Sequence, residues 1–250
     1  MTADGASARL AAPRIPFTRL VLVELRKSFN TRSARTVLAV FLVLGLLVLW
    51  AGLSQADARP PFSIALTPAE MLGPAFSVIG ILVMTTEWGH QTASLTFRLV
   101  PQRHRVLGAK VVAALALATA TAAGVLAVCG AVTAVYFAAA GVPITAEDLG
   151  SGLRALAVQT VMMTLLGLAW GALVMSTPVA IIICFVVSLA LDAVLFFARP
   201  GLVKWLSNSS VIDWLGRGEA FSPGVVTSFL LWYALPLAGG IVLQTRREAR

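Results

Sequence analysis

Long runs of apolar residues, separated by short polar segments, dominate the hydrophobic pattern of this chain of 250 residues. Uncharged apolar runs of about 18 or more residues are typical of helices that cross a membrane. The pattern therefore predicts an all-α integral membrane protein with one transmembrane domain. The six predicted spans are residues 36–53, 68–86, 111–140, 153–175, 178–198 and 224–243.

The second predicted span carries signals for both its start and a bend. Thr67, Pro68 and Glu70 have the spacing of a capping box, which predicts a helix that begins at Pro68. Pro74 lies within the same span, where a missing backbone N–H can kink a helix.

Small residues at a spacing of four predict close helix packing in the third and fourth spans. Gly167 and Gly171 form such a pair in span four. In span three, general richness in alanine could produce the same spacing. The span-three positions are Ala114, Ala118 and Ala122 on one stripe, and Ala116, Ala120 and Gly124 on another.

An amphipathic cationic segment precedes the first span, at residues 15–30. A helix with an apolar stripe and a basic side lies in the membrane interface. A cytoplasmic extension without membrane contact is the alternative. The stripe is Phe17, Val21, Leu25 and Phe29, and the basic side is Arg19, Arg26 and Lys27.

Composition supports a membrane protein and argues against nucleic-acid binding. The chain is 58% hydrophobic and 12% charged, about half the charge of a typical soluble protein. The net charge of +8 comes from cations beside the spans, with no basic patch interleaved with aromatic residues. Cys129 and Cys184 fall within apolar runs at opposite depths, so we expect two unpaired core residues.

The distribution of cations predicts the orientation. Six spans place both termini and the segment at 85–110 on one side, and this side holds 14 of the 19 Lys and Arg residues. Because cationic segments stay in the cytoplasm, both termini are predicted to be cytoplasmic. The other side has Arg59, Arg154, Arg199, Lys204 and Arg217.

The segment at 85–110 is the longest polar interruption in the first half of the chain. Trp88, Thr92, Leu95 and Leu99 share one face of a helix, which Pro101 should end. The spacing predicts a short amphipathic helix at 87–100, and a solvated connecting loop is the alternative.

Several residues of this segment resemble the loop between spans two and three of ABC-2 type exporter permeases. In that family the loop is a coupling helix that sits in a cleft of a separate ATPase subunit. The sequence departs from the pattern at Gln91, where the family has a small residue. The matching positions are Thr86-Glu87, Gln91-Thr92, Leu99, Pro101, Arg103, Val106-Leu107 and Ala109-Lys110.

The resemblance implies two cytoplasmic ATP-binding subunits that hold ATP and Mg, and a second permease copy or a homologous permease. It also implies that residues 15–30 form an elbow helix and that the segment at 199–222 is an outer helical hairpin. Trp205, Trp214 and Phe221 of that segment suit a membrane interface. The residues expected to contact the ATPase are Glu87, which we interpret as a polar anchor at the base of span two, Trp88, Gln91, Thr92, Leu95, Arg98, Pro101, Arg103 and Arg105.

Few polar groups lie inside the spans. Asp192 is the only charged residue deep within one, which makes it a candidate for the transport pathway. Contact with water, or pairing with Arg199, is the structural alternative. Gln159, Thr160 and Thr164 could line the same pathway or join helices by hydrogen bonds.

No catalytic site and no metal site is predicted. The chain has no G-x-x-x-x-G-K-[ST] and no H-E-x-x-H motif, and Glu87, His90 and His104 make a poor metal cluster. The expected protein is the permease subunit of an exporter in a bacterial inner membrane, which moves a hydrophobic or amphipathic substrate. The alternatives are an immunity or sensor subunit that binds a peptide or lipid-like antibiotic without transport, and a lipid-modifying enzyme.

Overall fold

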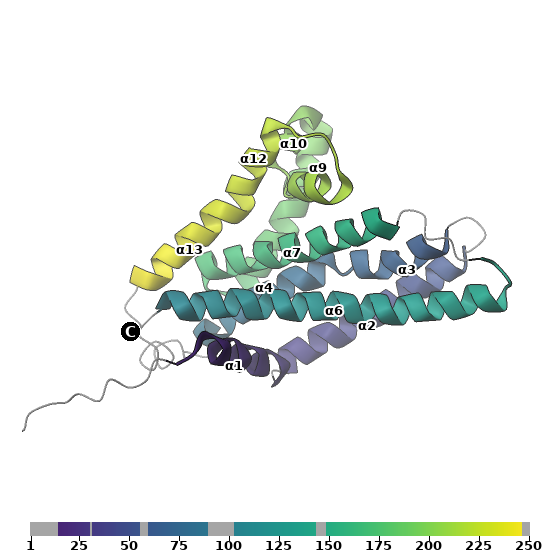
Figure 1. Cartoon of the computed structure of the whole chain (residues 1–250). Helices are drawn as coiled ribbons and strands as arrows, with labels where there is room; N and C mark the ends of the chain where they lie inside the picture. Colours follow the sequence, from purple (N-terminus) through teal and green to yellow (C-terminus); the bar gives the residue numbers. More distant parts are fainter. Residues whose placement is uncertain (1–14, 31, 56–59, 90–102, 144–148, 247–250) are drawn as a thin grey trace, which may run out of the picture.

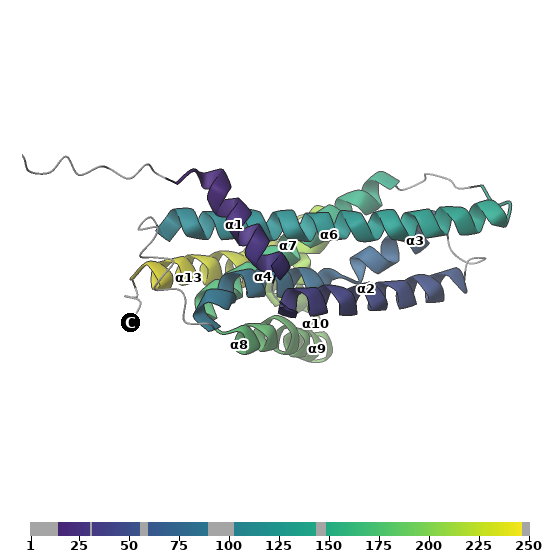
Figure 2. The ribbon, with the colours of Figure 1, turned by 90° about the horizontal axis from the view of Figure 1, so that it is seen from below.

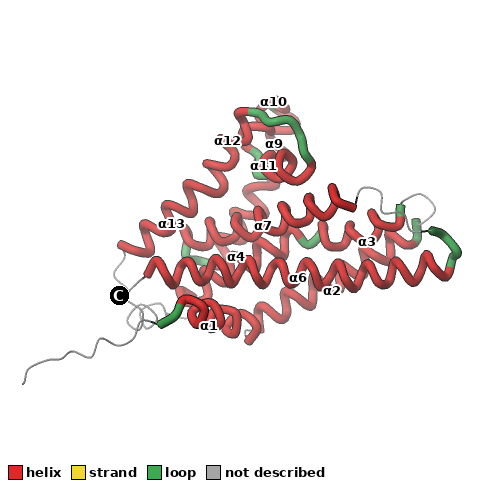
Figure 3. The backbone as a smooth tube through the Cα atoms, in the orientation of Figure 1, coloured by secondary structure: helices red, strands yellow, loops and turns green. Residues whose placement is uncertain are grey.

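The computed structural model describes residues 15–30, 32–55, 60–89, 103–143 and 149–246, which form helices and connecting loops without any strand (Figures 1 and 3). The prediction of an all-α chain is therefore confirmed. Among these residues, five helical segments are long and apolar enough to cross a membrane, and a further apolar segment, Ala39–Leu53, is shorter. The five are Pro61–Glu87, His104–Ala139, Leu149–Val174, Thr177–Ala198 and Pro223–Gln244.

The helices follow one another with short connections. The first half of the chain contains α1 (Phe17–Asn30), α2 (Arg32–Leu53), α3 (Pro61–Glu70), α4 (Gly73–Gly89) and α6 (Arg103–Ala139). The second half continues with α7 (Leu149–Val174), α8 (Thr177–Ile181), the π-helical turn η2 (Ile182–Val187) and α9 (Ser188–Ala198). The remaining elements are α10 (Pro200–Leu206), α11 (Ser209–Ile212), η3 (Asp213–Arg217), α12 (Pro223–Phe229), η4 (Leu230–Ala234) and α13 (Leu235–Arg246).

The predicted capping box at the start of span two is wrong. The helix begins about two turns earlier, at Pro61, with Pro60 as its N-cap. Thr67 lies inside α3, where its hydroxyl donates a 2.7 Å hydrogen bond to the Ser63 carbonyl oxygen. The apolar stretch before Thr67 packs well enough against α6 and α2 to be helical, so packing outweighs the local start signal.

The predicted bend at Pro74 is confirmed by the interruption between α3 and α4. Pro74 has no N–H to donate to the carbonyl of Glu70 four residues earlier. The side-chain amide of Gln159 on α7 takes its place, and its Nε2 donates to the Glu70 oxygen at 2.7 Å. Gly73 leaves room for this amide, because a Cβ there would lie 2.6 Å from Gln159 Nε2. A side chain on another helix thus supplies the hydrogen-bond donor that the bend removes.

The α4–α7 pair forms the centre of the bundle, and glycines bring the two backbones together. A Cβ at Gly167 would overlap the carbonyl oxygen of Ser77, and a Cβ at Gly80 would overlap that of Thr164. Gly171 lies against α4 in the same way, since its Cβ would be 3.1 Å from the Cβ of Met84. The predicted close packing of span four is confirmed.

One of the two small-residue stripes of span three faces the core. Ala114, Ala118 and Ala122 are buried on α6, whereas the alternative stripe is exposed. The two cysteines, Cys129 and Cys184, are buried and unpaired, as predicted.

The segment at 199–222 contains the short helices that its sequence suggests, and it folds back against the end of the bundle (Figure 1). Trp232 donates its Nε1–H to the Leu206 carbonyl at 2.6 Å, and the Thr227 hydroxyl bonds to the Trp205 carbonyl at 2.7 Å. These bonds fasten the hairpin to α12 and η4.

Large apolar side chains cover much of the described surface. On α9, Leu189 is 72% exposed and Phe197 is 84% exposed, and on α2 Trp50 is 70% exposed. A water-soluble monomer seldom exposes contiguous apolar surface of this kind, whereas lipid tails would cover it. The surface therefore fits a membrane-embedded chain.

Candidate functional site

Four charged side chains from three helices meet at one end of the bundle. Glu24 and Lys27 come from α1, Glu87 from the last turn of α4, and Lys110 from the second turn of α6. We call these four residues the ion-pair ring. The ring lies beside the end of α4, next to the stretch in which the sequence predicts the coupling helix.

Each lysine of the ring contacts both carboxylates. Lys27 Nζ lies 3.0 Å from Glu24 Oε1 and 2.7 Å from Glu87 Oε1. Lys110 Nζ lies 3.1 Å from Glu24 Oε2 and 3.4 Å from Glu87 Oε2. All four carboxylate oxygens therefore face an ammonium group, and the ring carries no net charge. Lys110 also donates a 3.1 Å hydrogen bond to the Val83 carbonyl on α4.

Three of the four groups are almost inaccessible to solvent. Glu24 is 6%, Glu87 5% and Lys110 3% exposed. Lys27 closes the ring on the outside, with 44% of its side chain exposed. Partial burial alone would lower the pKa of Lys27, but the hydrogen bond to Glu87 and the charges of both glutamates outweigh it and raise that pKa above its usual value. Buried charges are tolerated only when paired, so the ring fixes how the three helices meet.

The position of α1 explains how Glu24 reaches the ring. Helix α1 crosses the first part of α6 and reaches the end of α4 (Figure 2). Phe17 packs beside Gly108, and Arg105 donates a 2.8 Å hydrogen bond to the Ile15 carbonyl. These contacts hold the start of α1 against the part of α6 that precedes Lys110.

The structure describes only part of the predicted contact site for an ATPase. Glu87 belongs to the ion-pair ring, Trp88 lies in the last turn of α4, Arg103 begins α6, and Arg105 binds α1. The predicted coupling helix at 87–100 falls largely outside the described residues. The positions outside them are Gln91, Thr92, Leu95, Arg98 and Pro101.

Sequence reasoning found Glu87 but missed its partners. Glu24 is the only acidic residue in α1, and it lies three residues after Val21 and seven after Phe17, next to the apolar stripe. A lone carboxylate beside an apolar stripe indicates a cation on a neighbouring helix. Lys110 carries the same signal, because it lies four residues after the buried Val106.

The structure describes all four residues predicted for a transport pathway. Gln159 bonds the bend between α3 and α4, as described above. Thr160 and Thr164 are buried, and their hydroxyls donate to carbonyls one turn earlier on α7. Asp192 on α9 has a buried Oδ1 with no hydrogen-bond partner in the described part of the chain, and it forms no ion pair there with Arg199. Gln159 thus joins two helices by a hydrogen bond, which was the alternative to a place in the pathway.

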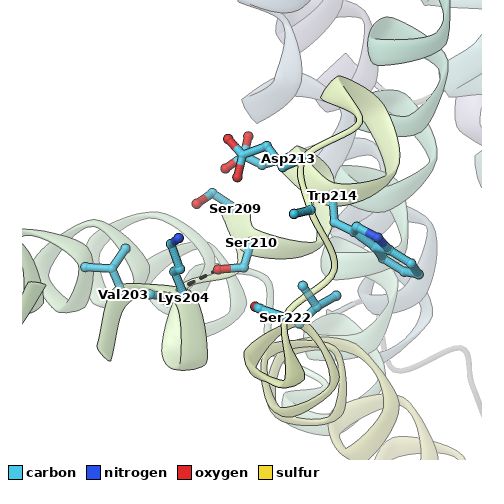
Figure 4. Close-up of a pocket in the computed structure, with 10 residues that line it drawn as sticks. Val203, Lys204, Ser209, Ser210, Asp213, Trp214 and Ser222 are labelled. Atoms are coloured by element: carbon cyan, nitrogen blue, oxygen red, sulfur yellow. Dashed lines mark hydrogen bonds between the residues drawn. The ribbon is translucent and has the colours of Figure 1, made fainter. Parts of the chain in front are cut away.

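A small polar cavity of about 190 Å³ opens in the hairpin at the other end of the molecule (Figure 4). Asp213 pairs with Arg217 at 3.0 Å, and Ser210 bonds to the Val203 carbonyl at 3.3 Å. Burial raises the pKa of Asp213, and the Arg217 charge partly opposes that rise. The cavity is smaller than the roughly 300 Å³ from which small-molecule pockets begin. The ion pair and the hydrogen bond beside this cavity both join residues of the hairpin itself.

No family model, curated protein or solved structure matches this chain. Across the described residues, no three His, Cys, Asp or Glu side chains gather closely enough to hold a metal ion. His90 lies outside those residues. The ion-pair ring is therefore the arrangement from which a function can be argued.

Proposed function

We propose that this chain is the membrane-spanning permease subunit of an ABC exporter of the ABC-2 type. It spans a bacterial inner membrane six times with both termini in the cytoplasm. A second permease copy, or a homologous permease, completes the pathway, and two cytoplasmic ATP-binding subunits supply the energy. The substrate is hydrophobic or amphipathic.

The observation that carries this proposal is the ion-pair ring. It joins the amphipathic helix α1 to the last turn of α4 and to the second turn of α6. The stretch that resembles a coupling helix lies between those two turns in the sequence. A force applied to that stretch would act first on Glu87 and Lys110, and through them on Glu24 of α1.

The arrangement of the helix ends supports the proposed topology. The start of α6, the end of α13 and helix α1 lie at one end of the molecule, and the α10–α11 hairpin and the end of α6 lie away from it (Figures 1 and 2). Among the described residues, α1 contributes Arg19, Arg26 and Lys27 to the first end, and the start of α6 contributes Arg105 and Lys110. The positive-inside rule assigns an end with such cations to the cytoplasm.

The ring suggests how ATP-driven closure of the partner would reach the membrane. Paired buried charges resist separation, because an unpaired charge in an apolar surrounding is costly. The three helices therefore move together instead of sliding past one another. Rigid-body displacement of this kind is a common way to transmit a local contact into a larger change.

Co-purification from the native membrane tests the proposal. Wild type and a Lys204→Ala control, changed at the opposite end, should recover a subunit with an ATP-binding sequence, identified by mass spectrometry. An Arg98→Ala variant should lose it while retaining its amount in the membrane. Recovery with all three would place the ATPase contact elsewhere on the chain. Absence of such a subunit from every preparation, in conditions that preserve membrane complexes, would refute the permease assignment.

A further inference from the structure

Helix α1 presents one face to its surroundings. Arg19, Leu22, Val23 and Arg26 recur at the three- and four-residue spacing of a single helix face, and all four are exposed. Leu22 is 54% and Val23 is 44% exposed. We call these four residues the outer face of α1. It has an apolar centre with one arginine on either side.

The opposite side of α1 is occupied by the rest of the protein. Glu24 belongs to the ion-pair ring, Leu25 packs against the buried core, and Phe17 lies beside Gly108 of α6. Phe17 and Leu25 belong to the apolar stripe that the sequence indicates, so at these positions the stripe packs against other helices. Contact with the surroundings is therefore left to the outer face.

The two arginines of the outer face have no anionic partner. Neither guanidinium group forms an ion pair or a side-chain hydrogen bond within the described residues, whereas Lys27 on the same helix pairs with two glutamates. Arginine binds phosphate oxygens through parallel N–H donors, and its apolar stem can lie along an apolar surface. Arg19 and Arg26 can thus reach phosphate groups while the apolar side chains between them lie deeper.

The position of α1 places the outer face at the depth of lipid headgroups. Helix α6 has 37 residues, or about 55 Å at helical rise, which exceeds the roughly 40–45 Å of a bilayer with its headgroups. Its first turns therefore pass through one headgroup layer. Helix α1 crosses these turns on the side of the bundle, where Arg105 binds the Ile15 carbonyl (Figure 2). The outer face consequently points sideways, towards the lipid that surrounds the bundle.

We propose that the outer face of α1 binds anionic lipid headgroups of the leaflet at the ring end. Arg19 and Arg26 contact the phosphates, and Leu22 and Val23 enter the upper part of the acyl chains. A cationic helix in this position is attracted by the negative potential of anionic lipids. The inference requires a membrane around the protein and does not rest on the permease proposal.

A quenching experiment measures which lipid lies next to the outer face. The purified full-length protein, with Cys129→Ala and Cys184→Ala, carries an NBD fluorophore on Leu22→Cys in vesicles of phosphatidylcholine and phosphatidylglycerol. In paired samples, one of the two lipids bears a nitroxide near the glycerol end of an acyl chain, which quenches a neighbouring fluorophore. The ratio of the two quenching efficiencies gives the local preference for phosphatidylglycerol. Leu47→Cys, exposed on the uncharged part of α2, is the control position for the label.

The arginines are tested by Arg19→Gln/Arg26→Gln in the protein labelled at Leu22→Cys. Arg199→Gln/Lys204→Gln is the matched control, because it removes the same charge from exposed positions at the opposite end. We expect a preference for phosphatidylglycerol of about 5- to 25-fold with the native arginines and in the control, since each surface cation contributes roughly a factor of five. It should fall to about 2-fold or less in Arg19→Gln/Arg26→Gln, and should decline with added salt. The label at Leu47→Cys should show no such preference.

Two results would overturn the proposal. Absence of quenching at Leu22→Cys by either lipid would show that water or another protein chain covers the outer face. Equal quenching by the two lipids, or an unchanged preference in Arg19→Gln/Arg26→Gln, would show that the arginines do not select anionic headgroups.

Discussion

Replacement of Lys110 by methionine removes the most deeply buried cation of the ion-pair ring while preserving the length of its side chain. The change abolishes contacts of 3.1 Å to Glu24 and 3.4 Å to Glu87, and also the hydrogen bond to the Val83 carbonyl. Two buried carboxylates are then left with Lys27 alone, which is half exposed to solvent.

The expected loss of stability follows from the burial of the remaining charges. Removal of one partner from a buried ion pair typically costs about 3–5 kcal/mol, because the other charge stays desolvated without compensation. For a chain of this size, about 1 kcal/mol corresponds to roughly 2–4 °C in Tm, so we expect Lys110→Met to lower Tm by about 6–20 °C.

Thermal unfolding in detergent, followed by size-exclusion fluorescence, measures this shift. Lys204→Met is the matched control, because Lys204 is exposed and forms no ion pair within the described chain. A surface change of that kind should alter stability by less than about 0.5 kcal/mol. Addition of Glu24→Gln to Lys110→Met removes one of the stranded carboxylates and should restore part of the Tm. Equal melting of the two methionine variants would refute the stabilising role of the ring.

Three further changes test other parts of the structure by the same melting assay. Gly167→Ala places a methyl group against the Ser77 carbonyl and should force α4 and α7 apart, whereas Gly130→Ala, which enters open space, should be tolerated; similar Tm values would contradict the close packing. Gln159→Leu leaves the Glu70 carbonyl without a donor and should cost about 1–3 kcal/mol, so an unchanged Tm would show that water replaces the amide. Because the pKa of Lys27 is raised in the folded state, the stability it contributes should be complete below about pH 10.5 and decline as the pH rises through the raised pKa. Lys27→Arg keeps its charge and should lose less stability over that range, and an identical alkaline decline in both proteins would argue against the raised pKa.

The hydrophobic pattern predicts most of the helices, because a membrane-spanning helix needs apolar side chains both where it faces lipid and where it packs inside the protein. Runs of apolar residues identified the long helices, and the Gly167–Gly171 spacing identified the tightest contact between them. The start of α3 was not predictable in the same way. A capping pattern at Thr67 competes there with packing against α6 and α2, and only the three-dimensional structure shows that packing wins.

The bend at Pro74 shows a second limit of local reasoning. Sequence alone indicates that the Glu70 carbonyl loses its normal donor, but it cannot say which group replaces that donor. Gln159 lies 89 residues away on another helix, and from sequence alone it was also a candidate for a pathway. Its role becomes clear only when α7 is placed beside the bend.

The ion-pair ring could be predicted only in fragments, because its charges come from distant parts of the chain. Glu24 is 86 residues from Lys110, and Lys27 is 60 residues from Glu87. Apolar side chains of similar size could hold three helices together at least as well, since desolvation offsets much of what a buried ion pair contributes. What paired charges add is a strict condition on geometry: the arrangement is favourable only while all four groups meet. A junction of this kind suits helices that must move as one unit, which is the property that the proposed permease requires at the end of α4.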